Sequence, residues 1–481
     1  MSMTIREMAQ AAGAELILPE AAQQHTAGRE VPLVCHDSRD VIPGSLFVCI
    51  RGEHSDGHDF AAQAVQSGAA ALLAERSPFD GLPPVPLLLA EARDSVRALG
   101  RMGNAWRKRY SGPVVGITGT AGKTTLKEIL AHTLTAVRGG TGKVARNPLN
   151  LNTQIGLPES MLAAKGDEDF WVMEAGISNP GDMDELGPIM EPTLAVILNA
   201  GAGHSLGLGD AGCGGAAHYK SRLLKYITPG GSALVSADYP DLVRESQAVR
   251  GDIIRFSTAR RDVPYHARYL GLTAEGKSRC LLWLDGHELE AESCLSGPFA
   301  AEIMIAAGAA AHLLGLKDEE ILSGLASAQP AAQRFNRREC AGWTLLDDTY
   351  NANPLSCSRM IEATAALRRE GEKLAFVMGE MLELGNLAES SHEELGTALA
   401  EAGADAVFWI GGYGDAVFRG LEKGGFQGRF TALNAHEDFL PAFSAWEETY
   451  RDGNSGIVLF KGSRGNHLEK LVKVFEEAHA L

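Results

Sequence analysis

The sequence predicts an α/β protein of three domains, with a central, mostly parallel, doubly wound sheet. Three observations support this prediction. The chain has 481 residues, whereas a typical domain has about 150. Apolar runs of strand length alternate with segments of helical spacing, which is typical of a parallel sheet covered by helices. One apolar run, at residues 113–118, leads into a glycine-rich turn and then into a helical segment from Lys123.

Residues 1–110 are expected to form a small N-terminal α/β domain. The apolar run at 45–50 predicts a strand, and residues 59–73 combine helical spacing with a second strand-like run. A proline-rich stretch at 82–86 interrupts the pattern. Residues 91–110 then predict a helix with a basic end that leads into the second domain.

Residues 111–330 are expected to form the central domain around the glycine loop. Further buried strands are predicted by apolar runs at 170–174, 194–198 and 232–236, with helical segments between them. The segment 251–296 differs, because short alternating runs and an Asp-Gly turn predict an antiparallel hairpin insertion. Two helices are predicted after it, at 297–314 and 317–328.

Residues 331–481 are expected to form a second doubly wound, Rossmann-like domain after a boundary near 329–333. Its predicted strands are 343–347, 374–378, 406–410 and 456–460, and helical segments separate them.

Composition and charge exclude several classes of protein. Hydrophobic residues make up 45% and charged residues 22% of the chain, as in ordinary soluble proteins. The formal net charge is −17, which argues against general binding of nucleic acid or of anionic membranes. Small phosphate-bearing ligands stay possible, because a few cations and helix amides can bind them locally.

The sequence offers little indication of a membrane span, a signal peptide, disulfides or a structural zinc site. No stretch approaches the roughly 20 apolar residues of a membrane span, and the N-terminal MSMTIREMAQ lacks the apolar core of a signal peptide. The seven cysteines are scattered without a C-x-x-C pair, which disfavours a disulfide framework and a structural zinc site. We therefore expect a cytoplasmic protein.

The glycine loop is the strongest local indication of chemistry. Its glycines would let backbone N–H groups close around phosphate oxygens at a helix N-terminus. Lys123 would reach the terminal phosphates and Thr124 would offer its hydroxyl to Mg²⁺. The loop is one residue shorter than the general Walker template, and a chance glycine turn before a helix is the alternative. The predicted ATP-binding residues here are Thr118, Gly119, Thr120, Ala121, Gly122, Lys123, Thr124 and Thr125.

Two further residues follow predicted strands of the central sheet. Glu174 ends the apolar run 170–174, at the edge where ligands collect in α/β folds, and a carboxylate there suits Mg²⁺. The alternative is a solvated acid at a strand end. His204 follows the run 194–198, although a lone histidine is more often structural or merely exposed.

Several motifs together resemble the Mur ligases, specifically the MurF branch of that family. The glycine loop T-G-T-x-G-K-T-T is followed by D-D-T-Y-N-A-N-P at 347–354, M-G-E-M-L-E-L-G at 378–385 and K-G-S-R at 461–464. The resemblance implies an ATP-dependent amide ligase that joins D-alanyl-D-alanine to UDP-N-acetylmuramoyl-tripeptide through an acyl phosphate. It places the protein in peptidoglycan precursor synthesis, and thereby in cell-wall biogenesis, cell shape and cell division. A monomer without nucleic-acid or membrane partners is expected.

The same resemblance assigns roles to individual residues. Lys220 matches a lysine that is carbamylated by CO₂ and holds Mg²⁺, together with Thr124, Glu174 and His204. Arg334 matches an arginine near the γ-phosphate and Asp348 an aspartate on the ribose. The alternatives are a surface lysine at 220 and a shifted register at Arg334, which lies near Arg337 and Arg338. The expected substrate-binding residues are Ser38, Arg39 and His58 for the UDP-sugar, Asn150 and Asn152 for the nucleotide-sugar substrate, Tyr350, Asn351 and Asn353 between ATP and the dipeptide, and Lys461, Ser463 and Arg464 for carboxylates.

One segment departs from the family pattern. Phe299, Ala300 and Ile303 stand where the family has a histidine and two asparagines, so the usual polar contacts around adenine are missing, and Phe299 could stack on the base instead. Three alternatives stay open, and this altered segment motivates the last of them. They are another amino-acid ligase of the superfamily, such as a folylpolyglutamate synthase-like enzyme, a P-loop kinase, and a nucleotide-binding module with weakened catalysis.

Overall fold

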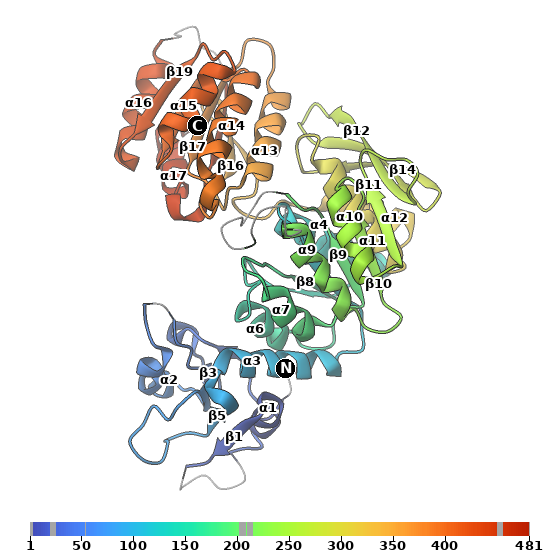
Figure 1. Cartoon of the computed structure of the whole chain (residues 1–481), viewed down its shortest axis with the longest axis vertical. Helices are drawn as coiled ribbons and strands as arrows, with labels where there is room; N and C mark the ends of the chain where they lie inside the picture. The colour runs from blue at the N-terminus through green and yellow to red at the C-terminus, as the bar shows by residue number, and fades with distance from the viewer. Residues whose placement is uncertain are drawn as a thin grey trace.

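Three sheets, one after another along the long axis of the molecule, form the framework (Figure 1). The computed structural model describes residues 3–19, 26–52, 54–201, 208, 215–449 and 456–480. The predicted three-part α/β architecture is confirmed. Within the described ranges, no helix is both long enough and apolar enough to span a bilayer.

The first sheet has five strands in the order β1-β5-β4-β3-β2, and all its neighbours are parallel except β1 and β5. Its side chains are mostly buried in the three middle strands. The elements are α1 (Ile5–Ala12), β1 (Ala14–Ile17), β2 (Val34–Cys35), β3 (Leu46–Val48), α2 (Ala61–Gln66), β4 (Ala71–Ala74) and β5 (Leu87–Ala90).

Helix α3 (Ser95–Arg109) connects the first sheet to the second. The predicted helix over 91–110 is wrong at its start, because Ala92 adopts a left-handed φ of 58° and Asp94 caps the helix by accepting a hydrogen bond from the Arg97 amide. Along α3, the side chain of Trp106 donates to the carbonyl of Ala164 at 3.1 Å. Buried residues of α3 belong to one apolar cluster with both sheets.

The second sheet has nine strands in the order β14-β13-β12-β11-β10-β9-β6-β8-β7. Strand β6 lies between β8 and β9 and is parallel to both, as a doubly wound sheet requires. The strands are β6 (Val114–Thr118), β7 (Val144–Arg146), β8 (Phe170–Glu174), β9 (Leu194–Ile197), β10 (Ser232–Ser236), β11 (Ile253–Ser257), β12 (Tyr265–Leu272), β13 (Ser278–Leu284) and β14 (His287–Ser293).

Helices cover both faces of this central sheet. One apolar cluster contains α3, α6 and α7, and the other contains α4, α11 and α12. The helices are α4 (Lys123–Leu134), α5 (Val137–Gly140), α6 (Gly156–Ala163), α7 (Asp182–Met190), α9 (Gly215–Ser221), α10 (Pro240–Val249), α11 (Ala300–Leu313) and α12 (Asp318–Ser327). Helix α11 begins three residues later than predicted, since Gly297 has a φ of 112° and Pro298 follows it.

The segment 251–296 is not an insertion, and that prediction is corrected. Strand β11 is parallel to β10 and continues the central sheet, and β12 is parallel to β11. Strands β12, β13 and β14 then form the expected antiparallel hairpins. The alternating apolar residues were correctly recognised as strands, but their alternation does not reveal which strand they pair with.

The third sheet has six strands in the order β15-β16-β20-β17-β18-β19, all parallel except the edge strand β15. Alternate side chains along β17 enter two apolar clusters, one under α13, α14 and α15 and one under α16 and α17. The second doubly wound unit is therefore confirmed. Its elements are β15 (Asn336–Cys340), β16 (Trp343–Asp348), α13 (Pro354–Leu367), β17 (Lys373–Gly379), α14 (Ala388–Glu401), β18 (Ala406–Ile410), α15 (Gly414–Lys423), β19 (Arg429–Leu433), α16 (Phe439–Glu447), β20 (Gly456–Lys461) and α17 (Glu469–Ala478).

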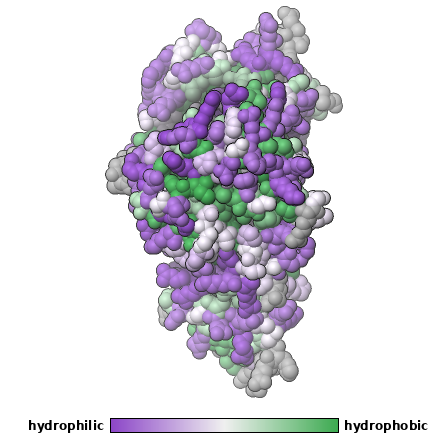
Figure 2. Space-filling model, turned by 90° about the vertical axis from the view of Figure 1, so that its right-hand side faces the viewer, coloured by the Kyte–Doolittle hydropathy of each residue, from purple (hydrophilic) through white to green (hydrophobic). Residues whose placement is uncertain are grey.

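The surface is largely hydrophilic on the face drawn in Figure 2, with hydrophobic residues gathered mainly across its middle. We call the second sheet with its helices the central lobe, and the third sheet with its helices the C-terminal lobe.

We expect Gly420→Ala to destabilise the C-terminal lobe. Helices α14 and α15 approach so closely that a methyl group at Gly420 would overlap the carbonyl oxygen of Glu393. Overpacking of this kind costs about 1–3 kcal/mol, measurable by urea unfolding followed by tryptophan fluorescence. Gly251→Ala is the control, because Gly251 faces open space. Equal stability of the two variants would contradict the proposed close helix contact.

Candidate functional site

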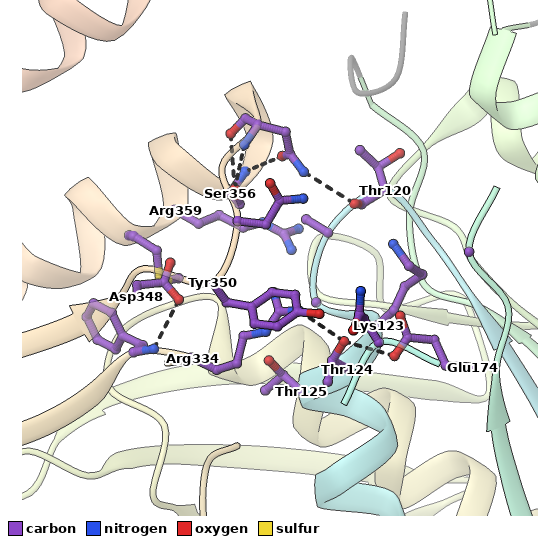
Figure 3. A pocket seen from close by; sticks show the side chains of 18 of the residues that line it. Thr120, Lys123, Thr124, Thr125, Glu174, Arg334, Asp348, Tyr350, Ser356 and Arg359 are labelled. Carbon is purple, nitrogen blue, oxygen red and sulfur yellow. Dashed lines mark hydrogen bonds between the residues drawn. The ribbon is translucent and has the colours of Figure 1, made fainter. Parts of the chain in front are cut away.

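A cavity of about 240 Å³ lies between the central and C-terminal lobes, and we call it the interlobe cavity. Figure 3 shows side chains from both lobes converging on it. The structure brings most of the predicted site residues together here: Thr120, Ala121, Gly122, Lys123, Thr124, Thr125, Asn150, Asn152, Glu174, Arg334, Asp348, Tyr350, Asn351, Asn353 and Lys461. Thr118 is buried in β6 below the loop, where its hydroxyl donates to the carbonyl of Ala175.

The glycine loop joins β6 to α4 as predicted. Gly122 occupies the position before the helix with a φ of 79°, which glycine adopts without strain. The side-chain oxygen of Asn199, just beyond β9, accepts hydrogen bonds from the amides of Thr120 and Ala121, both at 2.9 Å. Asn199 therefore fixes the shape of the loop from the neighbouring strand.

Glu174 is a buried group rather than a solvated acid at a strand end. It is 1% exposed, and its two carboxylate oxygens accept hydrogen bonds from the hydroxyl of Thr124 at 2.8 Å and the amide of Asn152 at 2.7 Å. A buried carboxylate beside a threonine hydroxyl is a suitable oxygen pair for a hard divalent cation.

Two lysines add positive charge at the same place. Lys123 lines the cavity, and burial of its ammonium lowers its pKa, against the opposing effect of the Glu174 carboxylate. Lys220, on α9, is 1% exposed. Its burial, with a smaller contribution from the charge of Lys123, lowers its pKa to about 7. A surface lysine at this position is thereby excluded.

The C-terminal lobe contributes a stacked arginine. The guanidinium of Arg334 lies 3.9 Å from the centre of the Tyr350 ring and donates to the hydroxyl of Thr124 across the cavity at 3.2 Å. Asn353 donates to the carbonyl of Thr120 at 3.4 Å. Both lobes therefore meet directly at the glycine loop (Figure 3).

Lys461, which we predicted to bind substrate carboxylates, lines the interlobe cavity and already has partners within the protein. It is buried, and its ammonium donates to Asp348 at 2.5 Å and to the carbonyl of Asn351 at 2.9 Å. Asp348 and Lys461 are direct partners on the paired strands β16 and β20, so the ammonium neutralises the aspartate. Asp348 also accepts from the amide of Phe335 at 3.0 Å.

Ser463 and Arg464 both lie at a second cavity beside the first. Ser463 is buried, its hydroxyl accepts from the amide of Leu382, and it lines this second cavity. Arg464 lines the same second cavity, which has a volume of about 540 Å³ and shares Tyr350 and Asn353 with the interlobe cavity. We call it the adjoining cavity.

The residues predicted for the UDP-sugar lie apart from both cavities, in short 3₁₀ turns of the N-terminal domain. The ring of His58 is buried, with one nitrogen bonded to Asp56 at 2.6 Å and the other accepting from the amide of Glu75 at 3.1 Å. Both nitrogens are engaged, so His58 is structural here, which corrects our prediction. Ser38 begins a short turn, and Arg39 is exposed and paired with Asp37. His204 lies outside the described residues.

Sequence reasoning missed three charged or polar side chains near the loop. Lys127 is fully buried, and its ammonium donates to the carbonyls of Asn147 and Leu149. Glu302 and Arg359 form an ion pair between the lobes at 2.6 Å. Helical spacing places Lys127 one turn after Lys123, which was an available signal, but nothing in the sequence connects Glu302 with Arg359.

An apolar wall lines the part of the interlobe cavity around Phe299. Its ring packs edge-on against Phe335, with centroids 5.9 Å apart, and Ala300 behind it is buried at the start of α11. The residues of this wall are Leu295, Phe299, Ile303, Phe335 and Met360.

Comparison with known protein domains covers most of the chain. Residues 117–311 match the Mur ligase middle domain, residues 333–464 the Mur ligase glutamate ligase domain, and residues 30–79 the Mur ligase family catalytic domain.

Whole proteins named UDP-N-acetylmuramoyl-tripeptide–D-alanyl-D-alanine ligase match nearly end to end. The chain is 30% identical over 471 residues to that of Bacillus subtilis (strain 168), covering 98% of this chain and 97% of the relative. The identity to that of Escherichia coli (strain K12) is 30% over 447 residues, covering 92% and 93%.

Solved structures agree with this relationship. MurF from Acinetobacter baumannii superposes with a TM-score of 0.87 at 28% identity, covering 99% of both chains. MurF ligase from Thermotoga maritima in complex with ADP gives a TM-score of 0.78 at 29% identity, covering 92% of this chain and 97% of that one. Fold, loop and full-length similarity together show that the chain belongs to the Mur ligase family, in its branch of UDP-N-acetylmuramoyl-tripeptide–D-alanyl-D-alanine ligases.

Proposed function

We propose that this protein is the ATP-dependent ligase that joins D-alanyl-D-alanine to UDP-N-acetylmuramoyl-tripeptide in cytoplasmic peptidoglycan precursor synthesis. The observation that carries the proposal is the meeting of both lobes at the glycine loop, where Arg334 contacts Thr124 beside Lys123 and Glu174. The similar Thermotoga maritima enzyme is described in complex with ADP. We propose that the protein acts as a monomer.

The chemistry needs an activated carboxylate. An amine cannot displace oxide from a carboxylate, because oxide is too basic to leave. Attack of the tripeptide carboxylate on the γ-phosphorus of ATP breaks the bond to ADP and forms an acyl phosphate. The dipeptide amine then attacks the acyl carbon, phosphate leaves, and the amine loses a proton. Lys123 and the loop amides stabilise the negative charge on the transferred phosphoryl group.

Residues of the site fit a magnesium ion, which would neutralise charge between the phosphates. The hydroxyl of Thr124 and the carboxylate of Glu174, 2.8 Å apart, would hold it together with a carbamylated Lys220. Bound ATP would replace the direct Arg334–Thr124 contact by a contact of Arg334 with the γ-phosphate, since an arginine fork suits phosphate oxygens.

Carbamylation of Lys220 is chemically reasonable in this environment. The neutral amine attacks CO₂, forms an N–C bond and releases a proton, so the reaction needs an unprotonated lysine. Burial lowers the pKa of Lys220 to about 7, whereas an exposed lysine at pH 7 is neutral in roughly one molecule in 2,500. The product carries a negative charge, which would offset the nearby charge of Lys123.

We propose positions for the other parts of the substrates. The apolar wall at Phe299 would contact adenine and Asp348 the ribose. The adjoining cavity, with Arg464 and Tyr350, would take the dipeptide. Asn150 and Asn152 would meet the nucleotide-sugar substrate, whose UDP end would lie near Ser38 and Arg39. In this proposal, residues 1–110 form the UDP-sugar-binding domain, residues 111–330 the ATP-binding domain and residues 331–481 the C-terminal domain.

An ADP-release assay with each substrate omitted in turn tests the proposed function. We expect ADP only when ATP, UDP-linked tripeptide and D-alanyl-D-alanine are all present, with a peptide-bonded product detected by mass spectrometry. Phosphorylation of a hydroxyl without an amine would indicate a kinase, and use of another amino acid would indicate a different ligase. ATP binding without turnover would indicate a module without catalysis.

Lys123→Ala should reduce kcat for ADP release by more than about a hundred-fold, since it removes a preorganised charge from the transferred phosphoryl group. Lys473→Ala is the control, because Lys473 is an exposed lysine of α17. Steady-state kinetics at saturating substrates gives the comparison. Turnover of Lys123→Ala at the wild-type rate would disprove the scheme.

Carbamylation of Lys220 should be visible by ¹³C NMR of protein equilibrated with ¹³CO₂. Protonation competes with CO₂ for the amine below its pKa of about 7. At a fixed CO₂ pressure, the carbamate signal should therefore rise between pH 6 and pH 8. Lys220→Met should lack the signal and lose activity. A signal absent at every pH in the wild type would refute the modification without refuting the ligase.

A further inference from the structure

A cluster of the buried Glu302 and the half-buried Tyr239 and Arg359 joins the two lobes beside the interlobe cavity. Arg359 on α13 of the C-terminal lobe donates to the Glu302 carboxylate on α11 of the central lobe at 2.6 Å. Its second terminal nitrogen donates to the hydroxyl of Tyr239 at 2.8 Å, and that hydroxyl donates to the other oxygen of Glu302 at 3.2 Å. The three side chains thus close a ring of hydrogen bonds across the lobe boundary.

The cluster is connected to the glycine loop. Glu302 also accepts a hydrogen bond from the side-chain nitrogen of Asn199 at 3.2 Å. The side-chain oxygen of Asn199 accepts from the backbone amides of Thr120 and Ala121. Arg359 itself lines the interlobe cavity. Figure 3 shows its side chain extending from the C-terminal lobe toward the side that carries Thr120 and Lys123.

Burial makes this pairing sensitive to lobe position. The side chain of Glu302 is 5% exposed and that of Arg359 is 17% exposed. A buried ion pair adds little net stability compared with an apolar contact, but the loss of one partner leaves a costly uncompensated charge. If the lobes separate, Glu302 is left as an unpaired carboxylate next to the loop that would bind triphosphate.

We propose that Arg359 and Glu302 form an interlobe clasp that couples closure of the C-terminal lobe to ATP affinity. Arg359 is a positioning residue in this scheme, since it acts through Glu302 and the loop. In the closed arrangement it neutralises Glu302, so the loop presents net positive charge to ATP. In an open arrangement the free carboxylate of Glu302 opposes triphosphate binding. The proposal rests on the proposed function only in placing ATP at this loop.

This coupling predicts unequal effects of the two partners. Arg359→Gln should weaken ATP binding about ten-fold or more, because Glu302 is left uncompensated. Glu302→Gln should weaken it less than about three-fold, because the repelling charge is removed together with the attraction. The double variant Glu302→Gln/Arg359→Gln should recover most of the affinity that Arg359→Gln loses. Arg359→Lys should be intermediate, since lysine keeps the charge but lacks the fork that reaches both Glu302 and Tyr239.

Calorimetry with a non-hydrolysable ATP analogue is the test, with KM for ATP and kcat measured on the same full-length proteins. Arg368→Gln is the matched control, because Arg368 lies at the end of the same helix and pairs with Asp405 inside the C-terminal lobe. Circular dichroism melting shows whether each variant is folded. The clasp is supported if KM for ATP rises in Arg359→Gln much more than kcat falls, and if the double variant recovers.

Two results would overturn the clasp. One is equal ATP affinity of Arg359→Gln and the wild type, and the other is a double variant that binds as weakly as, or more weakly than, Arg359→Gln. Failure of the wild type itself to bind the analogue would instead overturn the proposed ATP site. The variant Tyr239→Phe keeps the ion pair and removes the hydroxyl, and it should weaken ATP binding less than Arg359→Gln does.

Discussion

The arrangement around the glycine loop depends on the cost of keeping several charged groups away from water. Lys220 and Glu174 are almost completely buried, and Lys123 lies beside them with a lowered pKa. A charge in such a place must be neutralised, paired or bonded to a ligand. The carboxylate of Glu174 lies near the ammonium groups of Lys123 and Lys127, and burial lowers the pKa of Lys220 to about 7, so the site is electrostatically suited to phosphate and to an anionic modification of Lys220. The other lobe follows the same rule, because Lys461 neutralises Asp348.

Because the two lobes supply opposite halves of the site, their relative position is part of the chemistry. Thr124 and Glu174 belong to the central lobe, and Arg334 and Asp348 to the C-terminal lobe. A reactive acyl phosphate must be kept from water until the amine arrives. Contacts that cross the lobe boundary therefore help to keep water from the acyl phosphate, whereas contacts within one lobe would not.

Much of the fold and of the nucleotide site could be predicted from the sequence, for a physical reason. Strands buried on both faces appear as continuous apolar runs, so Val114–Thr118, Phe170–Glu174 and Ala406–Ile410 were recognisable within one residue of their observed bounds. The glycine loop is contiguous in sequence, and its position between strand and helix identifies it. Glu174 could be placed because parallel strands present their carboxyl ends at one edge.

Features that depend on pairing across the fold were not predictable in this way. The residue types of Lys461 and His58 suggested ligand contacts. In the structure, Lys461 pairs with Asp348 and His58 accepts from the amide of Glu75, and both partners are distant in the sequence. Strand pairing beyond β11 could not be read from alternation. Loss of the histidine and asparagines at Phe299, Ala300 and Ile303 was evident, but the charge at Glu302 in the same segment acquires meaning only through Arg359, which lies 57 positions away.

Helix α3 has a consequence for substrate length. It packs against α1 of the first sheet and against α6 and α7 of the central lobe, and Arg107 donates to the carbonyls of Met190 and Glu191. The fifteen residues of this helix therefore connect the first sheet to the central lobe through packed contacts rather than through a flexible linker. The helix thereby fixes the distance between the N-terminal domain and the glycine loop. A nucleotide-sugar bound to the N-terminal domain would extend over that fixed distance to reach the loop. In the proposed reaction, this fixed spacing would bear on which peptide length brings its terminal carboxylate to the γ-phosphorus.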